Sequence, residues 1–155
     1  MPIAPQSASR ALAWRHGVLS VDSLGGMLSA TTFVLPDGRQ VSPFQIAPWA
    51  DEPGTGDLPA LLQRLRGEWP CVPFGGDGDR QASAGWPASE SRLTQDPEPH
   101  GFGSNHHWTF EAGTLDHISL TIDYPETHPI RRLERHVSPV ADSSAIDFQL
   151  VVHVR

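Results

Sequence analysis

Two short segments hold the side chains of this sequence that could do chemistry, each within a cluster of Gly, Pro and aromatic residues. The first runs from Arg66 to Gly75 and reads RGEWPCVPFG, and the second runs from Pro99 to Trp108 and reads PHGFGSNHHW. Glycine lets a backbone approach a ligand closely, whereas proline fixes the local path of the chain. Trp and Phe offer flat apolar faces, which suit the CH face of a sugar ring.

In this order and at this spacing, the two segments resemble the aldose 1-epimerase, or galactose mutarotase-like, superfamily. The closest likeness is to its hexose-6-phosphate mutarotase branch, in which a strand reading roughly GG-x-P-x-C-x-P-x-FG precedes an HGF segment and a Trp. The likeness runs in order from roughly Trp14 to Arg155, through segments 123–135 and 145–154. It implies an all-β fold, an antiparallel β-sandwich of the galactose mutarotase-like type. Because the domains of this family are much longer than 155 residues, it implies the N-terminal half of one.

His100 is the candidate catalytic residue. Its context, Pro-His-Gly-Phe, resembles that of the first active-site histidine of the family, which donates a hydrogen bond to the sugar near the ring oxygen. A histidine suits this role because its ordinary pKa lies near neutrality, so that the ring can donate or accept a proton. The alternative is a histidine that is buried in a glycine turn for packing.

Three residues of the first segment are candidate substrate contacts. The resemblance implies that Arg66 contacts substrate oxygens, including a phosphate in the hexose-phosphate branch, and a guanidinium fork suits such oxygens. The alternative is a surface arginine at the end of a helix, where it complements the helix dipole. Trp69 and Phe74 can stack on a sugar or pack in the core. Cys71 is expected to be packed and inert, because nothing nearby supplies the electropositive, exposed setting of a reactive thiol.

The stretch from Asn105 to His107 departs from the family pattern, which more often has an Arg near this position. Adjacent histidines on a strand point to opposite faces, so His106 and His107 cannot both bind one ion. No His-x-His spacing occurs and no carboxylate lies in ligand register, so we predict no metal and no cofactor. One histidine is expected to face the pocket and the other solvent. Asn105 and His107 are the predicted substrate contacts.

Composition favours a single globular domain and excludes several classes of function. The chain has 155 residues, of which 38% are apolar. Its 14 glycines and 15 prolines indicate many turns. A net charge of −7 argues against nucleic-acid binding, and the absence of lysine excludes Schiff-base and P-loop chemistry. The single cysteine excludes an internal disulfide. No apolar run is long enough to span a membrane and no signal peptide is evident, so a cytoplasmic location is expected.

The predicted organisation is one β-sandwich domain over residues 14–155, preceded by a flexible N-terminus over residues 1–13. Asp37-Gly38 lies between two apolar, β-branched runs, which is a strong signal for a hairpin. Residues 75–98 are polar, have no period and predict a long loop. Segments 118–124 and 146–154 alternate apolar with polar residues and predict strands.

One short helix is expected, over residues 57–66. Asp57 can cap its N-terminus, and Gly67 can end it with a positive φ. The leucines of this segment fall on one face, at positions i, i+3, i+4 and i+7. They are Leu58, Leu61, Leu62 and Leu65.

The predicted function is that of a carbohydrate-binding, aldose 1-epimerase-like protein, which interconverts the α and β anomers of a hexose or hexose phosphate. In the family a late glutamate acts as the base and a second histidine as the acid, and neither position exists in this chain. Two alternatives stay open: a non-catalytic carbohydrate-binding or regulatory module, and a structural or interaction protein. The partners expected are a sugar or sugar phosphate. Self-association is expected through residues 145–155, because an exposed apolar edge strand pairs with other chains.

Overall fold

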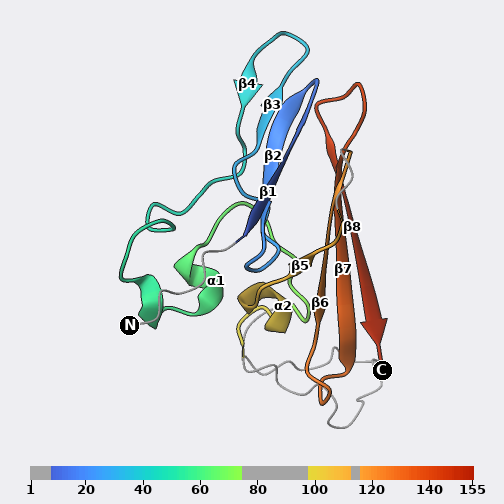
Figure 1. Ribbon diagram of the computed structural model, residues 1–155. Helices are drawn as coiled ribbons and strands as arrows, with labels where there is room; N and C mark the ends of the chain where they lie inside the picture. Colours follow the sequence, from blue (N-terminus) through green and yellow to red (C-terminus); the bar gives the residue numbers. More distant parts are fainter. Residues whose placement is uncertain (1–7, 75–97, 113–115) are drawn as a thin grey trace, which may run out of the picture.

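The computed structural model describes residues 8–74, 98–112 and 116–155, and it contains two four-stranded antiparallel sheets (Figure 1). The strand order follows the sequence in both sheets, so that neighbouring strands are also consecutive in the chain. The first sheet consists of β1 (Ser9–Trp14), β2 (Gly17–Asp22), β3 (Thr32–Val34) and β4 (Gln40–Val41). The second consists of β5 (Thr109–Phe110), β6 (Ile118–Asp123), β7 (Ile130–Pro139) and β8 (Ile146–Val154). The all-β antiparallel sandwich is confirmed.

The Asp37-Gly38 hairpin forms where its sequence predicts it. Strands β3 and β4 pair in register Phe33↔Val41. Two hydrogen bonds close the turn between them, from the Leu35 N–H to the Arg39 carbonyl oxygen and from the Gly38 N–H to the Leu35 carbonyl oxygen. Gly38 has a φ of 83°, a conformation that glycine adopts without a steric penalty. The carboxylate of Asp37 accepts a hydrogen bond from the Arg39 backbone N–H at 3.1 Å, which holds the turn from outside.

The second sheet positions the C-terminal part of the chain. Strand β6 is buried on both of its faces from Ile118 to Ile122, and only its last residue, Asp123, is exposed. Strand β7 pairs with β6 in register Leu120↔Arg135 and with β8 in register Arg135↔Leu150. Both strands expected over 118–124 and 146–154 are therefore confirmed, and β8 lies at the edge of its sheet (Figure 1).

The hydrophobic core lies between the two sheets. Its buried side chains come from β1 and β2 on one side and from β6 and β7 on the other. Burying a Leu, Ile or Val side chain contributes about 1.5–3 kcal/mol relative to leaving it in water. Polar contacts join the sheets at one end: Trp14 Nε1 donates to the Ser143 carbonyl oxygen at 3.0 Å, and Ser144 Oγ donates to that of Val34 at 2.6 Å. The fully buried core residues are Leu19, Val21, Leu28, Leu120, Leu133 and Val137.

The helix expected over 57–66 is wrong in its extent. A 3₁₀ turn spans Thr55–Asp57, and a single α-helical turn, α1, spans Ala60–Gln63. Between them Leu58 is extended, with φ −82° and ψ 151°, because the residue before a proline avoids the helical region. After Arg64 the chain becomes extended again, and Arg66 bridges to Ile46. Asp57 caps neither turn.

Two further expectations for this helix fail for the same reason. Of the four leucines that would share one helical face, Leu61 is buried, whereas Leu58 and Leu62 are exposed. Gly67 has the expected positive φ of 55°, but it lies beyond the helix and passes against Leu28. A Cβ at Gly67 would come within 1.7 Å of the Leu28 carbonyl oxygen, so a close backbone approach requires this glycine.

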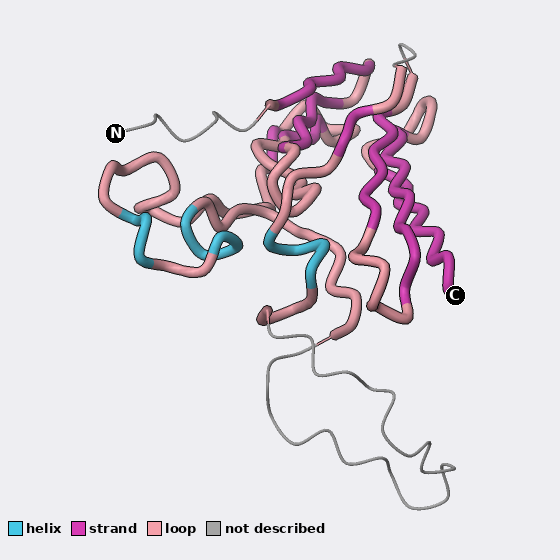
Figure 2. Tube along the Cα trace, turned by 60° about the horizontal axis from the view of Figure 1, so that its bottom comes forward, coloured by secondary structure: helices cyan, strands magenta, loops and turns pink. Residues whose placement is uncertain are grey.

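A second α-helical turn, α2 (Phe102–Asn105), was not predicted. Figure 2 shows the helical turns beside the strands, with α1 and α2 as neighbours. The Leu61 N–H donates to Asn105 Oδ1 at 3.1 Å, which ties the two turns together. No helix among the described residues is long and apolar enough to cross a membrane.

Regular structure begins closer to the N-terminus than expected. The predicted flexible segment included residues 8–13, but Ser9–Trp14 forms β1 and pairs along its whole length with β2. Leu12 of this strand enters the core, which explains why the strand is held. Of the predicted long loop at 75–98, residues 75–97 lie outside the described residues.

Candidate functional site

The structure brings the two sequence motifs together, although some 25 residues separate them. Gly101, with a φ of 87°, passes directly against Val72, and a Cβ at Gly101 would come within 2.2 Å of the Val72 carbonyl oxygen. Only glycine fits this contact. The Ser104 hydroxyl lies 3.0 Å from the Pro70 carbonyl oxygen and 2.8 Å from that of His100, so it links both motifs. The segment 100–102 (HGF) therefore packs directly against the segment 70–73 (PCVP).

Tyr124 and Asn105 fix this junction from two sides. The Tyr124 hydroxyl donates to the Val72 carbonyl oxygen at 2.6 Å and accepts from the Gly103 N–H at 3.0 Å. Asn105 Nδ2 donates to the carbonyl oxygens of Pro99 at 2.8 Å and Gly101 at 3.0 Å. The buried Asn105 amide thus makes three hydrogen bonds to the chain itself, including that from Leu61. Its predicted role as a substrate contact is not tested, but its polar atoms already hold the backbone around His100.

His100 and Trp69 form the aromatic centre of this junction. Their rings pack in a T-shaped arrangement, with centroids 6.2 Å apart and planes at 80°. His100 has a φ of 64°, which is uncommon for a residue other than glycine. The His100 Nδ1 atom is buried and has no hydrogen-bond partner among the described residues. A buried ring nitrogen without a partner is uncommon in folded proteins and costs free energy, which marks this ring as a candidate for a functional role.

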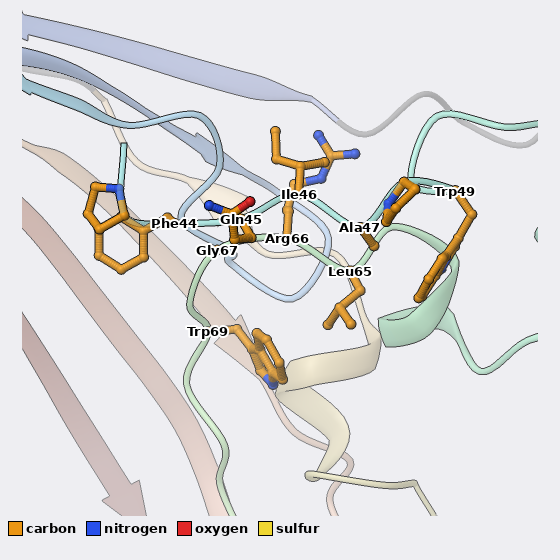
Figure 3. Close-up of a pocket in the computed structure, with 11 residues that line it drawn as sticks. Phe44, Gln45, Ile46, Ala47, Trp49, Leu65, Arg66, Gly67 and Trp69 are labelled. Atoms are coloured by element: carbon orange, nitrogen blue, oxygen red, sulfur yellow. The ribbon is translucent and has the colours of Figure 1, made fainter. Parts of the chain in front are cut away.

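Trp69 also borders an open hollow of about 600 Å³ (Figure 3). One wall is the segment from Pro43 to Trp49, and the other is the segment from Leu65 to Trp69. The two walls are joined by backbone hydrogen bonds, because Ala47 N–H donates to the Leu65 carbonyl and Gly67 N–H to that of Gln45. The lining is mostly apolar and aromatic, as is usual for small-molecule sites. His100 does not line the hollow, but it contacts the Trp69 ring that does.

Arg66 is one of the residues that line the hollow, and its guanidinium is bound by other groups of the protein. The residue is only 7% exposed. Its Nη1 lies 3.1 Å from an Asp22 carboxylate oxygen and its Nη2 lies 3.1 Å from one of Asp51, while Nε donates to the Arg64 carbonyl at 3.0 Å. All three guanidinium nitrogens therefore have acceptors within the protein. The alternative expectation of a surface arginine is therefore wrong, and contact of Arg66 with substrate oxygens stays a prediction.

A second buried arginine lies near the same motif. Arg135 on β7 is 2% exposed and pairs through Nη2 with the Glu68 carboxylate, while its guanidinium lies over the Phe148 ring at 5.3 Å. Its Nε and Nη1 atoms are buried without partners among the described residues. Burial lowers the pKa of Arg135, and the Glu68 charge opposes this shift. Sequence reasoning missed this pair, because Arg135 and Glu68 lie 67 positions apart in the chain.

The remaining predicted contacts lie outside the hollow. Phe74 is 79% exposed and does not line it. His107 is exposed, and its Nδ1 lies 2.9 Å from Ser23 Oγ; desolvation, helped by the positive charges of His106 and Arg64, lowers its pKa. His106 stacks on Phe102, with its Nε2 2.9 Å from Glu98. The two histidines thus have separate partners, as adjacent residues on an extended backbone should.

The thiol of Cys71 is partly buried beside the same junction. Burial raises its pKa, while Ser104 and Trp69 partly offset this effect and the Glu68 charge adds to it. A raised pKa leaves little thiolate at neutral pH, which fits an unreactive cysteine. Among the described residues, no group of three or more His, Cys, Asp or Glu side chains is arranged to hold a metal ion.

One wall of the hollow was missed by sequence reasoning. The segment before α1 is rich in proline and glycine, as is typical of a loop, but Pro43, Phe44, Ile46 and Trp49 line the hollow. Two large apolar side chains, Ile46 and Trp49, are each more than one third exposed, which is unusual for a simple connection. The aromatic and apolar content of this loop is the signal that could have identified it.

The fold is similar to that of two solved structures described as aldose epimerases or their homologues, and this chain spans less than half of the length of each. A structure from Escherichia coli K12, described as a candidate aldose 1-epimerase, superposes with a TM-score of 0.58 at 18% sequence identity, covering 96% of this chain and 46% of that one. A GalM/aldose epimerase homologue from C. elegans superposes with a TM-score of 0.50 at 11% identity, covering 96% of this chain and 47% of that one. Neither protein-family profiles nor curated protein sequences give a match for this chain.

Proposed function

We propose that this chain binds a hexose, as the carbohydrate-binding part of an aldose 1-epimerase-like protein that interconverts α and β anomers. The observation that carries the proposal is the position of Trp69. Its ring borders the hollow on one side and contacts His100 on the other, where Nδ1 has no partner. An indole face suits the CH face of a sugar, and a neutral or protonated imidazole suits a ring oxygen or hydroxyl. The likeness of the fold to that of the aldose 1-epimerases supports the same class of ligand.

The charges around the hollow favour an uncharged hexose over a hexose phosphate. Arg66 is the one arginine that lines the hollow, and its guanidinium is held by the carboxylates of Asp22 and Asp51. A phosphate would have to compete with two charges of its own sign for this cation. A role of Arg66 in phosphate binding is therefore replaced in this proposal by a structural role.

Binding without catalysis is the second candidate, because the residues that line the hollow include no Asp, Glu or His. Mutarotation needs a base for the anomeric hydroxyl proton and an acid for the ring oxygen. Among the described residues neither group lines the hollow, because the Trp69 ring lies between the hollow and His100 and no carboxylate borders it. A cytoplasmic location remains a prediction from the sequence.

Isothermal titration calorimetry tests hexose binding directly. The chain is titrated with glucose, galactose and glucose 6-phosphate, and we expect the uncharged sugars to bind more tightly. Trp69→Ala should weaken hexose binding about tenfold, which corresponds to a stacking contribution of about 1.4 kcal/mol. The matched aromatic control is Phe74→Ala, because Phe74 is exposed and lies outside the hollow. Equal effects of both substitutions, with circular dichroism unchanged, would contradict the proposed site.

Polarimetry separates the two candidates. Freshly dissolved α-glucose or α-galactose is mixed with the chain, and the approach to anomeric equilibrium is followed by optical rotation. Acceleration above buffer that is lost in His100→Ala supports an isomerase whose catalytic groups lie within these 155 residues. Hexose binding without acceleration supports the carbohydrate-binding role for this part of the fold.

A further inference from the structure

Strand β8 has one edge that no strand among the described residues pairs with. Its other edge pairs with β7 from Ile146 to Val154, in the register Arg135↔Leu150. Figure 1 shows β8 as the outermost strand of its sheet. A free edge presents a row of backbone N–H and C=O groups that can pair with another strand.

This edge lacks the features by which proteins usually protect an edge strand. It is nine residues long and contains no proline, glycine or lysine. The edge strand β4 of the other sheet has only two residues, as has β5 at the opposite edge of the β8 sheet. Short edges, charges and prolines suppress pairing, so β8 is the edge best suited to it.

One face of β8 is also an exposed apolar row. Its residues are directly opposite the core-facing residues of β7, since Leu150 pairs with Arg135 and Val152 with Leu133. The row therefore continues the core face of the sheet beyond the area that the first sheet covers. Four of its side chains are exposed, from 40% for Leu150 to 70% for Val154. They are Phe148, Leu150, Val152 and Val154.

The sequence of β8 is complementary to itself when read in the opposite direction. If two copies pair antiparallel with Leu150 at the two-fold axis, all nine residues of each strand find an opposite partner. Apolar residues then face apolar residues at every position of the row: Ile146 faces Val154, Phe148 faces Val152 and Leu150 faces itself. Cross-strand pairs of this kind stabilise a sheet by about 0.2–1 kcal/mol each.

On the other face of β8 the same register places Asp147 of one copy opposite His153 of the other and Gln149 opposite Val151. Each pair occurs twice because of the two-fold symmetry. His153 Nε2 already lies 2.9 Å from a Glu134 carboxylate oxygen of its own chain, so the imidazole would lie between two carboxylates. Moving the axis by one residue to position 149 leaves fewer paired residues and places Asp147 opposite Val151. Moving the axis to position 151 places Asp147 opposite Arg155. The guanidinium of Arg155 is already hydrogen-bonded to the carbonyl oxygens of His128 and Pro125 in its own chain.

We propose that two copies of this chain associate through β8, antiparallel and with Leu150 at the two-fold axis, to form a continuous eight-stranded sheet. The occupant of the free edge is thus a second copy of the same strand. Sedimentation and light scattering of the purified chain should show the mass of two chains at micromolar concentration.

Leu150→Lys tests the interface, because it places two ammonium groups opposite each other at the axis. The measured mass should fall to that of one chain. Val41→Lys is the matched control, since Val41 is an exposed apolar residue on the edge strand of the other sheet and its variant should remain dimeric. A monomeric parent chain, or an oligomer that persists in Leu150→Lys, overturns the proposal.

Cysteine crosslinking tests the register. In a Cys71→Ala background, Leu150→Cys should form an intermolecular disulfide on mild oxidation, because opposite Cβ atoms in a sheet are about 4.5–5.5 Å apart. Phe148→Cys should not, because the two copies of residue 148 lie four positions, or about 13 Å, apart along the strands. Crosslinking of Phe148→Cys as efficient as that of Leu150→Cys overturns this register.

Discussion

Arg66 and Arg135 are both buried cations, but the protein satisfies them to very different degrees. Arg66 has an acceptor for each of its three guanidinium nitrogens, and two of these acceptors are carboxylates. Arg135 has one carboxylate partner, Glu68, and two nitrogens without partners among the described residues. Both arginines are connected to the first sequence motif. Arg66 is its first residue, and Arg135 pairs with Glu68, which lies two positions further on.

The difference indicates which of the two buried cations contributes more to the stability of the fold. A buried charge stabilises a structure only when its hydrogen-bonding groups are filled, since desolvation otherwise outweighs the attraction. Arg66 meets this condition and connects β2, through Asp22, to the loop that carries Asp51. Arg135 does not meet it, so its contribution to folding is smaller although it is more deeply buried. Burial by itself is therefore a poor measure of what an ion pair contributes.

The largest effect is expected for Arg66→Met. This substitution leaves Asp22 without its cation, and the Asp22 side chain is only 9% exposed. Removing one partner of a buried pair leaves an uncompensated charge and costs about 3–5 kcal/mol. Urea denaturation followed by circular dichroism should show a loss of this size in the free energy of unfolding.

The double variant Arg66→Met, Asp22→Asn is the control for this interpretation. It removes both charges, so part of the lost stability should return. If the double variant is as unstable as the sum of the two single variants, the ion pair is not what Arg66 contributes.

A much smaller effect is expected when the same substitution is made at the other arginine. Arg135→Met removes two unpartnered buried donors, and the Glu68 carboxylate that it leaves is 40% exposed and can be hydrated. The methionine keeps contact with Phe148, so the free energy of unfolding should change by about 1 kcal/mol or less. A loss in urea denaturation as large as that of Arg66→Met would show that both cations are structural.

The smallest effect is expected on Cys71, whose thiol responds to the charge of Glu68. In Arg135→Met the Glu68 carboxylate loses its counter-ion, so the pKa of Cys71 should rise further and its reaction with a disulfide reagent at pH 8 should slow. The change should be less than about fivefold, because solvent screens a half-exposed carboxylate. Glu68→Gln should have the opposite effect and speed the reaction, and a change of the same sign in both variants would contradict the pairing of Arg135 with Glu68.

Much of the fold could be predicted because it depends on local patterns. Strands β6 and β8 follow from alternation of apolar and polar residues, and the β3–β4 hairpin follows from Asp37-Gly38. The helix prediction failed because the leucine period was given more weight than the constraint that Pro59 places on Leu58. The strand at Ser9–Trp14 was not predicted. It is held in place by its pairing with β2, and no local pattern in the sequence indicates that pairing.

The sequence by itself determined the all-β class of fold and the two motifs rich in glycine and proline, whereas the role of His100 stays a prediction. Those motifs consist of glycines and prolines whose backbone geometry is local, so their types could be interpreted without coordinates. Only the tertiary structure decided what each side chain does within them. It directed the Arg66 guanidinium to Asp22 and Asp51, left Phe74 in solvent, and brought residues 43–49 beside Trp69 to form a hollow. The physical reason is that an ion pair or a cavity depends on groups distant in sequence, and their meeting is set by sheet pairing rather than by local propensity.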